Sequence, residues 1–122
     1  MAKKILVVDD EPHIVKMIES RLTANGYDVI TASDGQEGLE KAQGENPDLI
    51  LLDVMMPKLT GYKVSRLLKF DERFKNIPII MLTARSQEND IELGTEVGVN
   101  LYITKPFEAQ DLLNSIKKIL GE

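Results

Sequence analysis

Five short apolar runs alternate with segments of helical periodicity along this chain of 122 residues, and that alternation restricts the fold more than any other feature. A helix between two parallel strands packs back onto their sheet, so the pattern is typical of a parallel sheet with helices on both faces. Each run has the length of a strand, and consecutive runs lie about one βα unit apart. The predicted strands cover residues 4–8, 28–32, 49–53, 79–83 and 101–104.

The apolar character of each run also predicts its place in the sheet, because a central parallel strand is covered on both faces and an edge strand is not. The first, third and fourth runs are continuously apolar, whereas the second and fifth are mixed. We therefore expect a doubly wound, flavodoxin-like α/β fold with five parallel strands in the order 2-1-3-4-5. In such a sheet, ligands bind at the carboxyl ends of strands one and three, where the strand order reverses.

Capping and stop signals define the first two helices. Pro12 stands at a permitted position at the start of the first helix, and Asn25 and Gly26 end it. Asp34, with Glu37 three residues later, resembles a capping box and begins the second helix.

The third and the last helix are predicted from their periodicity. Thr60 and Gly61 begin the third, with Val64, Leu67 and Leu68 expected to face inward. The last helix fits the amphipathic template closely. Its apolar positions are Leu112, Leu113, Ile116, Ile119 and Leu120.

Residues 86–97 predict a fourth helix that packs less firmly than the others. Its apolar anchors are Ile91, Leu93 and Val97, and Gly94 lowers its helix propensity. We expect a modest free energy to shift this element.

Length, charge and cysteine content narrow the class of protein. The length fits one domain with its own core, spanning residues 1–122. The net charge of −5 argues against direct nucleic-acid binding, which needs a basic face. Strand-sized apolar runs and an amino terminus unlike a signal peptide predict a cytoplasmic protein without membrane association. Cysteine is absent, so oxygen atoms or the single histidine must hold any metal.

Carboxylates gather at the two strand ends that border the predicted crevice. Asp9, Asp10 and Glu11 follow the first strand, and Asp53 ends the third. Asp10 and Glu11 could simply cap the next helix. Asp53 follows a continuous apolar run, where an acid is normally excluded unless it is paired or bound to a ligand. Crowded carboxylates repel one another unless a cation compensates, and an oxygen-only site suits Mg²⁺.

Two further polar residues follow neighbouring strand ends. Thr83 ends the fourth strand and Lys105 follows the fifth. Thr83 could be a helix cap, and Lys105 a solvated charge beside Pro106. Together with the acids they indicate phosphoryl transfer, because an aspartate can form an acyl phosphate while a lysine, a hydroxyl and Mg²⁺ stabilise the phosphoryl oxygens.

Four motifs on these strand ends resemble those of one protein family. They are DDEP at 9–12, DVMMP at 53–57, TA at 83–84 and KPF at 105–107. In this order they resemble the receiver domain of two-component response regulators, and the resemblance extends over essentially the whole chain. It implies a signalling switch that is phosphorylated by a sensor histidine kinase and catalyses only its own phosphorylation and slow dephosphorylation.

The resemblance also implies a metal site. Asp53 would be the phospho-acceptor, and Asp10, Asp53 and the backbone carbonyl of Met55 would bind Mg²⁺. Asp9 would support the metal through water.

Activation residues follow from the same resemblance. Thr83 and Lys105 would contact the phosphoryl group, and the peptide bond between Lys105 and Pro106 would be cis. Tyr102 aligns with an aromatic residue that changes rotamer on activation. An output protein or effector domain would then bind the surface formed by the fourth helix, the fifth strand and the fifth helix.

Other residues are expected to lie outside the chemistry. His13, on the first helical turn, is predicted to be solvated or to cap the helix. Met17, Met55, Met56 and Met81 are predicted to pack in or near the core.

Two other classes of protein fit parts of the pattern. A Mg²⁺-dependent phosphohydrolase that forms an aspartyl phosphate usually carries a second acid two residues after its nucleophile, where this chain has Met55. A flavin or nucleotide carrier needs a glycine-rich phosphate loop after its first strand, where this chain has acids. The hydrolase is the alternative to the switch. The sequence leaves open the cognate kinase, the output, the oligomeric state and whether the receiver stands alone or belongs to a longer regulator.

Overall fold

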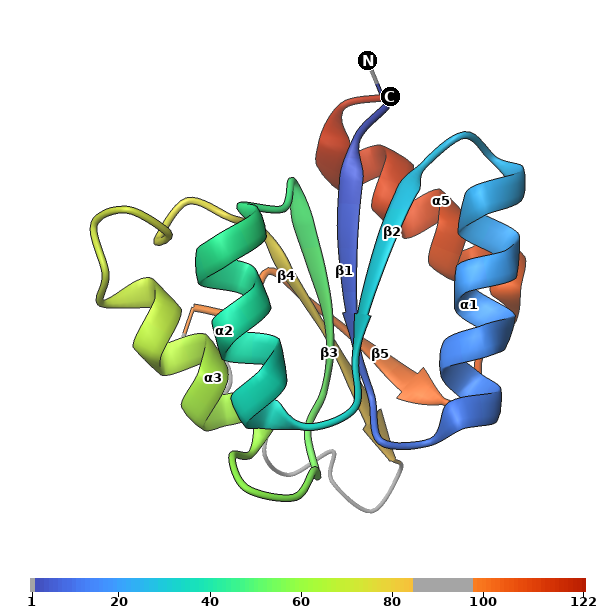
Figure 1. Cartoon of the computed structure of the whole chain (residues 1–122). Coiled ribbons are helices and arrows are strands. Elements are labelled where there is room, and N and C mark those ends of the chain that lie inside the picture. The colour runs from blue at the N-terminus through green and yellow to red at the C-terminus, as the bar shows by residue number, and fades with distance from the viewer. Residues whose placement is uncertain (1, 85–97) are drawn as a thin grey trace.

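A computed structural model describes residues 2–84 and 98–122, which form a five-stranded parallel sheet with helices on both faces (Figure 1). The order β2-β1-β3-β4-β5 confirms the predicted topology. The fourth and fifth strands each extend one residue beyond their predicted ends. The strands are β1 (Lys4–Val8), β2 (Asp28–Ala32), β3 (Leu49–Asp53), β4 (Ile79–Ala84) and β5 (Leu101–Lys105).

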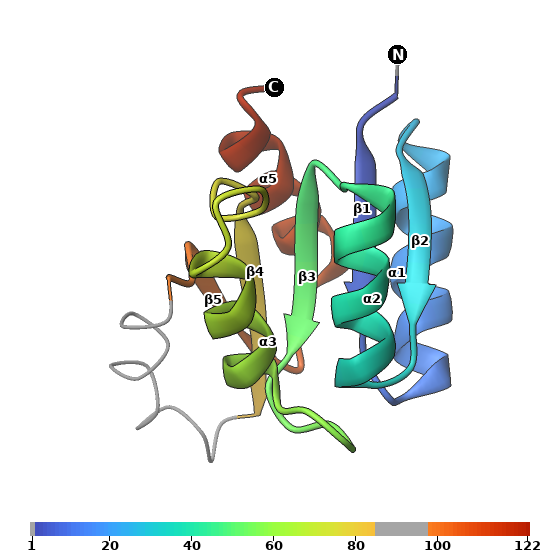
Figure 2. The same ribbon diagram turned by 60° about the vertical axis from the view of Figure 1, so that its left-hand side comes forward.

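Helices α1 and α5 cover one face of the sheet, and α2 and α3 cover the other (Figures 1 and 2). The helix predicted over residues 86–97 lies outside the described residues. The described helices are α1 (Pro12–Ala24), α2 (Gly35–Glu45), α3 (Gly61–Lys69) and α5 (Ala109–Leu120).

Each central strand contributes to two separate cores, because successive side chains of a strand point to opposite faces. In β1, Ile5 and Val7 pack with α1 and α5, whereas Leu6 and Val8 pack with α2 and α3. Strands β1, β3 and β4 are almost wholly buried, and the edge strands β2 and β5 are half-exposed. The burial of the strands therefore agrees with the prediction that the continuously apolar strands are central and the mixed strands lie at the edges.

The predicted starts of the first three helices are observed, each with a physical cause. Pro12 occupies the first turn of α1, where its missing N–H costs no helical hydrogen bond. The Asp34 side chain accepts a hydrogen bond from the Glu37 backbone N–H at 2.8 Å and caps α2. The Thr60 hydroxyl oxygen accepts one from the Lys63 N–H at 3.2 Å and caps α3.

Three predicted core positions are wrong. Leu67 is 40% exposed because the buried stripe of α3 runs through Val64 and Leu68, and a residue three after Val64 falls to the side of it. Met17 is 41% exposed on α1, and Met55 is 60% exposed in the loop after β3. Met56 and Met81 are buried as predicted, and His13 is solvent-exposed.

The two chain ends lie at the edge of the sheet opposite to the carboxyl ends of the strands (Figures 1 and 2). The Tyr27 hydroxyl donates a 2.6 Å hydrogen bond to the Glu122 carboxylate there. The pKa of Tyr27 is raised to about 12, mainly by burial and to a smaller extent by the Glu122 carboxylate. In the described part of the chain, no helix combines the length and apolar character needed to cross a bilayer.

Candidate functional site

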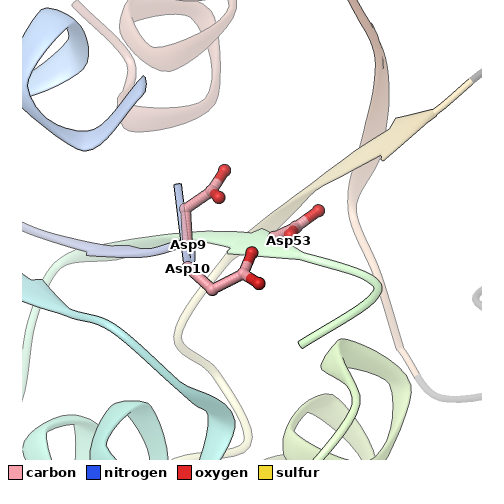
Figure 3. Close-up of side chains that lie close together, drawn as sticks. All are labelled: Asp9, Asp10 and Asp53. Carbon is pink, nitrogen blue, oxygen red and sulfur yellow. The ribbon is translucent and has the colours of Figure 1, made fainter. Parts of the chain in front are cut away.

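Three aspartates meet at the carboxyl ends of β1 and β3 (Figure 3). One carboxylate oxygen from each of Asp9, Asp10 and Asp53 lies within 4.8 Å of the other two. Asp9 and Asp53 are 1% and 6% exposed, whereas Asp10 is exposed to solvent. The arrangement matches the predicted acidic crevice, with one face open and two carboxylates buried.

Sheet pairing explains why residues far apart in sequence come together. Strands β1 and β3 are parallel neighbours, and Val8 pairs with Leu52. The next residue in each case is an aspartate, so Asp9, directly after β1, and Asp53, the last residue of β3, lie side by side. The Asp9 N–H donates to the Ala32 carbonyl at 3.1 Å, and its side chain accepts from the Glu11 N–H at 3.0 Å.

The side chain of Lys105 crosses the sheet edge to reach these acids. Its Nζ donates to Asp9 Oδ2 at 2.8 Å and lies 3.3 Å from Asp53 Oδ1 and 3.7 Å from Glu11 Oε1. Only 13% of the lysine side chain is exposed, so the interpretation of Lys105 as a solvated surface charge is wrong. The peptide bond between Lys105 and Pro106 is cis, as predicted.

The alternative in which the acids cap α1 is also wrong. Glu11 occupies the cap position of α1, and its side chain makes no capping hydrogen bond. Glu11 instead approaches the Lys105 ammonium and the exposed His13. Asp10 is therefore left facing the carboxylate pair rather than the helix.

Burial and charge shift two protonation equilibria in the site. The pKa of Asp53 rises from 3.8 to about 6, chiefly because burial disfavours its charged form and also because Asp9 and Asp10 repel it. Lys105 opposes this rise without cancelling it. Burial by itself would lower the pKa of Lys105, but the hydrogen bond to Asp9 and the charges of Asp53, Asp9 and Glu11 together raise it.

Thr83 and Tyr102 lie on the adjacent strands β4 and β5. Thr83 is 2% exposed and directly follows Leu82, the residue that pairs with Asp53. Tyr102 is half-buried, pairs with Met81, and packs against the core under α2 and α3. Strand alternation puts Thr83 on the same face of the sheet as Met81, so Thr83 and Tyr102 face the same side.

The loop between β3 and α3, residues 54–60, directly follows Asp53 and carries Met55. Its two ends are drawn together by a 2.7 Å hydrogen bond from the Gly61 N–H to the Val54 carbonyl. A Cβ on Gly61 would lie 2.3 Å from the Asp53 carbonyl oxygen, so this close approach requires glycine. This contact was not predicted from the sequence, although glycine at a predicted helix start was its signal.

A contact between Lys58 and Asp34 was also missed. Lys58 has a positive φ of 70°, and its Nζ lies 3.3 Å from Asp34 Oδ2. Asp34 was predicted only as a helix cap. Nothing in the spacing of the sequence indicates that the two loops touch, because the contact depends on the sheet order.

The donor set at the sheet edge is suited to a hard cation. The three aspartates offer only oxygen atoms, and Asp10 faces solvent, so a metal bound here would retain water. A cavity of about 400 Å³ adjoins Asp9 and Asp10. Its charged lining includes more carboxylates than ammonium groups, which argues against a bound nucleotide or flavin phosphate. These charged residues are Asp9, Asp10, Glu19, Glu37, Lys16 and Lys41.

Fold and site together define a doubly wound α/β protein with a carboxylate and lysine centre at its topological switch point. Residues 5–117 match the response regulator receiver domain. The chain belongs to the receiver-domain family of response regulators.

Relatives and solved structures agree with this assignment. The chain is 52% identical over 120 residues to the alkaline phosphatase synthesis transcriptional regulatory protein PhoP of Bacillus subtilis, covering 98% of this chain and 49% of that protein. A putative response regulator from Chloroflexus aurantiacus superposes with a TM-score of 0.93 at 34% identity, and all of both chains is covered. The chain spans about half the length of the curated relatives it matches.

A further solved structure bears on the metal. The receiver domain of a sensor histidine kinase from Pseudomonas aeruginosa superposes with a TM-score of 0.90 at 33% identity over the full length of both chains. That structure has a magnesium ion coordinated in its active site cleft. In this chain, Asp9, Asp10 and Asp53 form an acidic cluster whose geometry could hold a metal ion.

Proposed function

We propose that this receiver domain is a phosphorylation switch that accepts one phosphoryl group on the Asp53 carboxylate from a sensor histidine kinase. The observation that carries the proposal is a buried aspartate between two other carboxylates and the Lys105 ammonium. With a pKa of about 6, Asp53 is mostly ionised at neutral pH and available as a nucleophile.

Transfer forms one bond and breaks another. An Asp53 oxygen attacks phosphorus, and the bond between phosphorus and the donor nitrogen breaks, with its electron pair leaving on the histidine ring. Lys105, already 3.3 Å from Asp53 Oδ1, would donate hydrogen bonds to the transferred oxygens. Thr83 would do so from the neighbouring strand through its hydroxyl.

Asp10, Asp53 and the Met55 backbone carbonyl would hold Mg²⁺, with Asp9 supporting it through water. When bound, the ion neutralises negative charge on the carboxylates and the incoming donor. The carboxylate oxygens within 4.8 Å of one another support this assignment.

A first prediction concerns Asp10 and the metal. Mg²⁺ that binds the folded state stabilises it by about 2.7 kcal/mol at a hundredfold excess over Kd. Replacing Asp10 by Asn removes repulsion from the metal-free site and one metal ligand. We expect Asp10→Asn to be at least as stable as wild type in EDTA and to gain less stability from Mg²⁺, measured by urea denaturation.

Asp28→Asn is the matched control, because Asp28 is also exposed but is the first residue of β2. It therefore lies at the amino ends of the strands, away from the site. It should retain the full Mg²⁺ increment. If Asp10→Asn loses stability in EDTA and keeps the full increment, Asp10 is not a ligand.

The output would begin at Thr83. Drawing its hydroxyl toward a phosphoryl group on Asp53 vacates space on the face of the sheet that Tyr102 shares. We propose that Tyr102 then turns inward and changes the surface of β5, α5 and the helix predicted over 86–97, which lies outside the described residues.

A second prediction follows for Thr83→Ala. The variant should still be phosphorylated at Asp53 but should fail to transmit the change to β5. Amide chemical shifts, recorded before and after phosphorylation or with a beryllofluoride mimic, should move at residues 101–105 in wild type and not in the variant. Identical distant shifts in the two proteins would rule out coupling through Thr83.

The named relatives are transcriptional regulators, so we propose that this domain controls transcription through an output protein or an attached effector domain. Direct DNA contact by this domain is disfavoured by its net charge of −5. The alternative, an aspartyl-phosphate phosphohydrolase, lacks its usual general acid because position 55 is an exposed methionine. A hydrolase would turn over many donor molecules, whereas a switch is modified once.

A further inference from the structure

The loop of residues 54–60, which carries Met55, is anchored on both sides. On the β3 side, the Val54 N–H donates to the Leu82 carbonyl at 3.2 Å, and the Val54 carbonyl accepts from Gly61 at 2.7 Å. These bonds tie the two ends of the loop to the sheet. They leave the middle of the loop, from Met55 onward, to be fixed by other contacts.

The other anchor is the start of α2. Lys58 Nζ lies 3.3 Å from Asp34 Oδ2, while Asp34 Oδ1 caps the helix through the Glu37 N–H at 2.8 Å. Both carboxylate oxygens of Asp34 are therefore used, one for the helix and one for the loop. A Cβ on Gly35 would lie 2.0 Å from the Leu59 carbonyl oxygen, so the loop lies directly against the helix backbone.

Lys58 adopts a backbone conformation that lysine rarely adopts. Its φ of 70° lies in the left-handed region, which costs free energy for a residue with a Cβ. Such a conformation persists only where surrounding contacts enforce it. The hydrogen bond from Glu37, with a smaller contribution from Lys58, lowers the pKa of Asp34, so this carboxylate is ionised at neutral pH.

We infer that Lys58 is a positioning residue whose ion pair with Asp34 holds the 54–60 loop against α2 and thereby fixes the Met55 carbonyl at the metal site. Met55 lies along the chain between the anchor at Val54 and the anchor at Lys58, so the loop is tied on both sides of this residue. This inference rests on the proposed function, since it requires the metal to bind at Asp53 and Met55.

The test removes the pair without changing net charge. In Asp34→Asn/Lys58→Asn, the amide oxygen at position 34 can still cap α2, and asparagine tolerates the left-handed region at position 58. Titration calorimetry with MgCl₂ should show Mg²⁺ affinity about two- to fivefold weaker than in wild type, as expected for a partly exposed ion pair. The single variant Lys58→Arg, which keeps both the charge and Asp34, should retain most of the wild-type affinity.

Amide hydrogen exchange in metal-free protein gives a second readout. In the double variant, exchange should quicken at Leu59, whose N–H donates within the loop, and not at Asp9, whose N–H donates to Ala32. A general loss of stability would accelerate exchange at both positions. It would contradict a positioning role.

Two results separate this inference from the proposed function. If Asp10→Asn weakens Mg²⁺ binding but the double variant binds like wild type, Lys58 does not position the site and the proposed function stands. The same conclusion follows if the effects of Asp34→Asn and Lys58→Asn on Mg²⁺ affinity, measured separately, add up to the effect of the double variant. If wild type itself binds no Mg²⁺, the proposed metal site and this inference both fail.

Discussion

Asp53→Asn is expected to abolish phosphorylation, while wild type gains the mass of a single phosphoryl group. An amide is a far weaker nucleophile than a carboxylate, and Asp53 is the buried acid that Lys105 and the other two aspartates surround. Intact-protein mass spectrometry after incubation with Mg²⁺ and a small acyl phosphate measures the change directly.

Asp28→Asn again serves as the control, because it removes one exposed carboxylate far from the site. It should be modified like wild type. Equal labelling of wild type and Asp53→Asn would show that another residue accepts the phosphoryl group. Release of many equivalents of phosphate per wild-type molecule would favour the hydrolase.

The same substitution should stabilise the metal-free protein at neutral pH. The pKa of Asp53 is about 6 in the folded protein and 3.8 ordinarily, so the folded state binds its proton more tightly than the unfolded state. Stability from this group is therefore fully present below about pH 4 and is lost as the pH rises toward 6 and above. An elevation of about two pKa units corresponds to about 3 kcal/mol.

We therefore expect Asp53→Asn to exceed wild type by up to about 3 kcal/mol in the free energy of unfolding at pH 7 in EDTA, and the two proteins to converge near pH 4. Urea denaturation across this range measures the difference, in which groups common to both proteins cancel. A difference that is constant with pH would refute the raised pKa. A less stable variant at pH 7 would mean that attraction to Lys105 outweighs burial.

The strand pattern predicted correctly where the acidic residues meet, because their placement depends on one geometric rule. Parallel strands bring their carboxyl ends to one edge, so knowing that β1 and β3 are neighbours was enough to bring Asp9 and Asp53 together. The same rule put Thr83 and Lys105 at that edge. It could not show that Lys105 already binds Asp9.

The sequence-based predictions were wrong or incomplete where the three-dimensional surroundings of a side chain determine its burial or its partner. Leu67 and Met17 are apolar but lie outside the buried stripes of their helices, and the spacing of apolar residues alone did not exclude them. The contact between Lys58 and Asp34 joins two loops that are distant in sequence. Its geometry requires a left-handed backbone that no local signal at position 58 predicts.

The position of Lys105 also limits how many partners its ammonium group can bind at one time. Its ammonium starts from the edge strand β5 and reaches Asp9 beyond β1, so one side chain links the outermost strand to the middle of the sheet. An ammonium has three hydrogens to donate. A phosphoryl group on Asp53 would compete with Asp9 and Glu11 for these hydrogens. Each hydrogen bond that Lys105 donates to the phosphoryl group is no longer available to these two acids. Phosphorylation would then redistribute existing interactions across the sheet, and Asp9 and Glu11 would lose part of their interaction with the Lys105 ammonium.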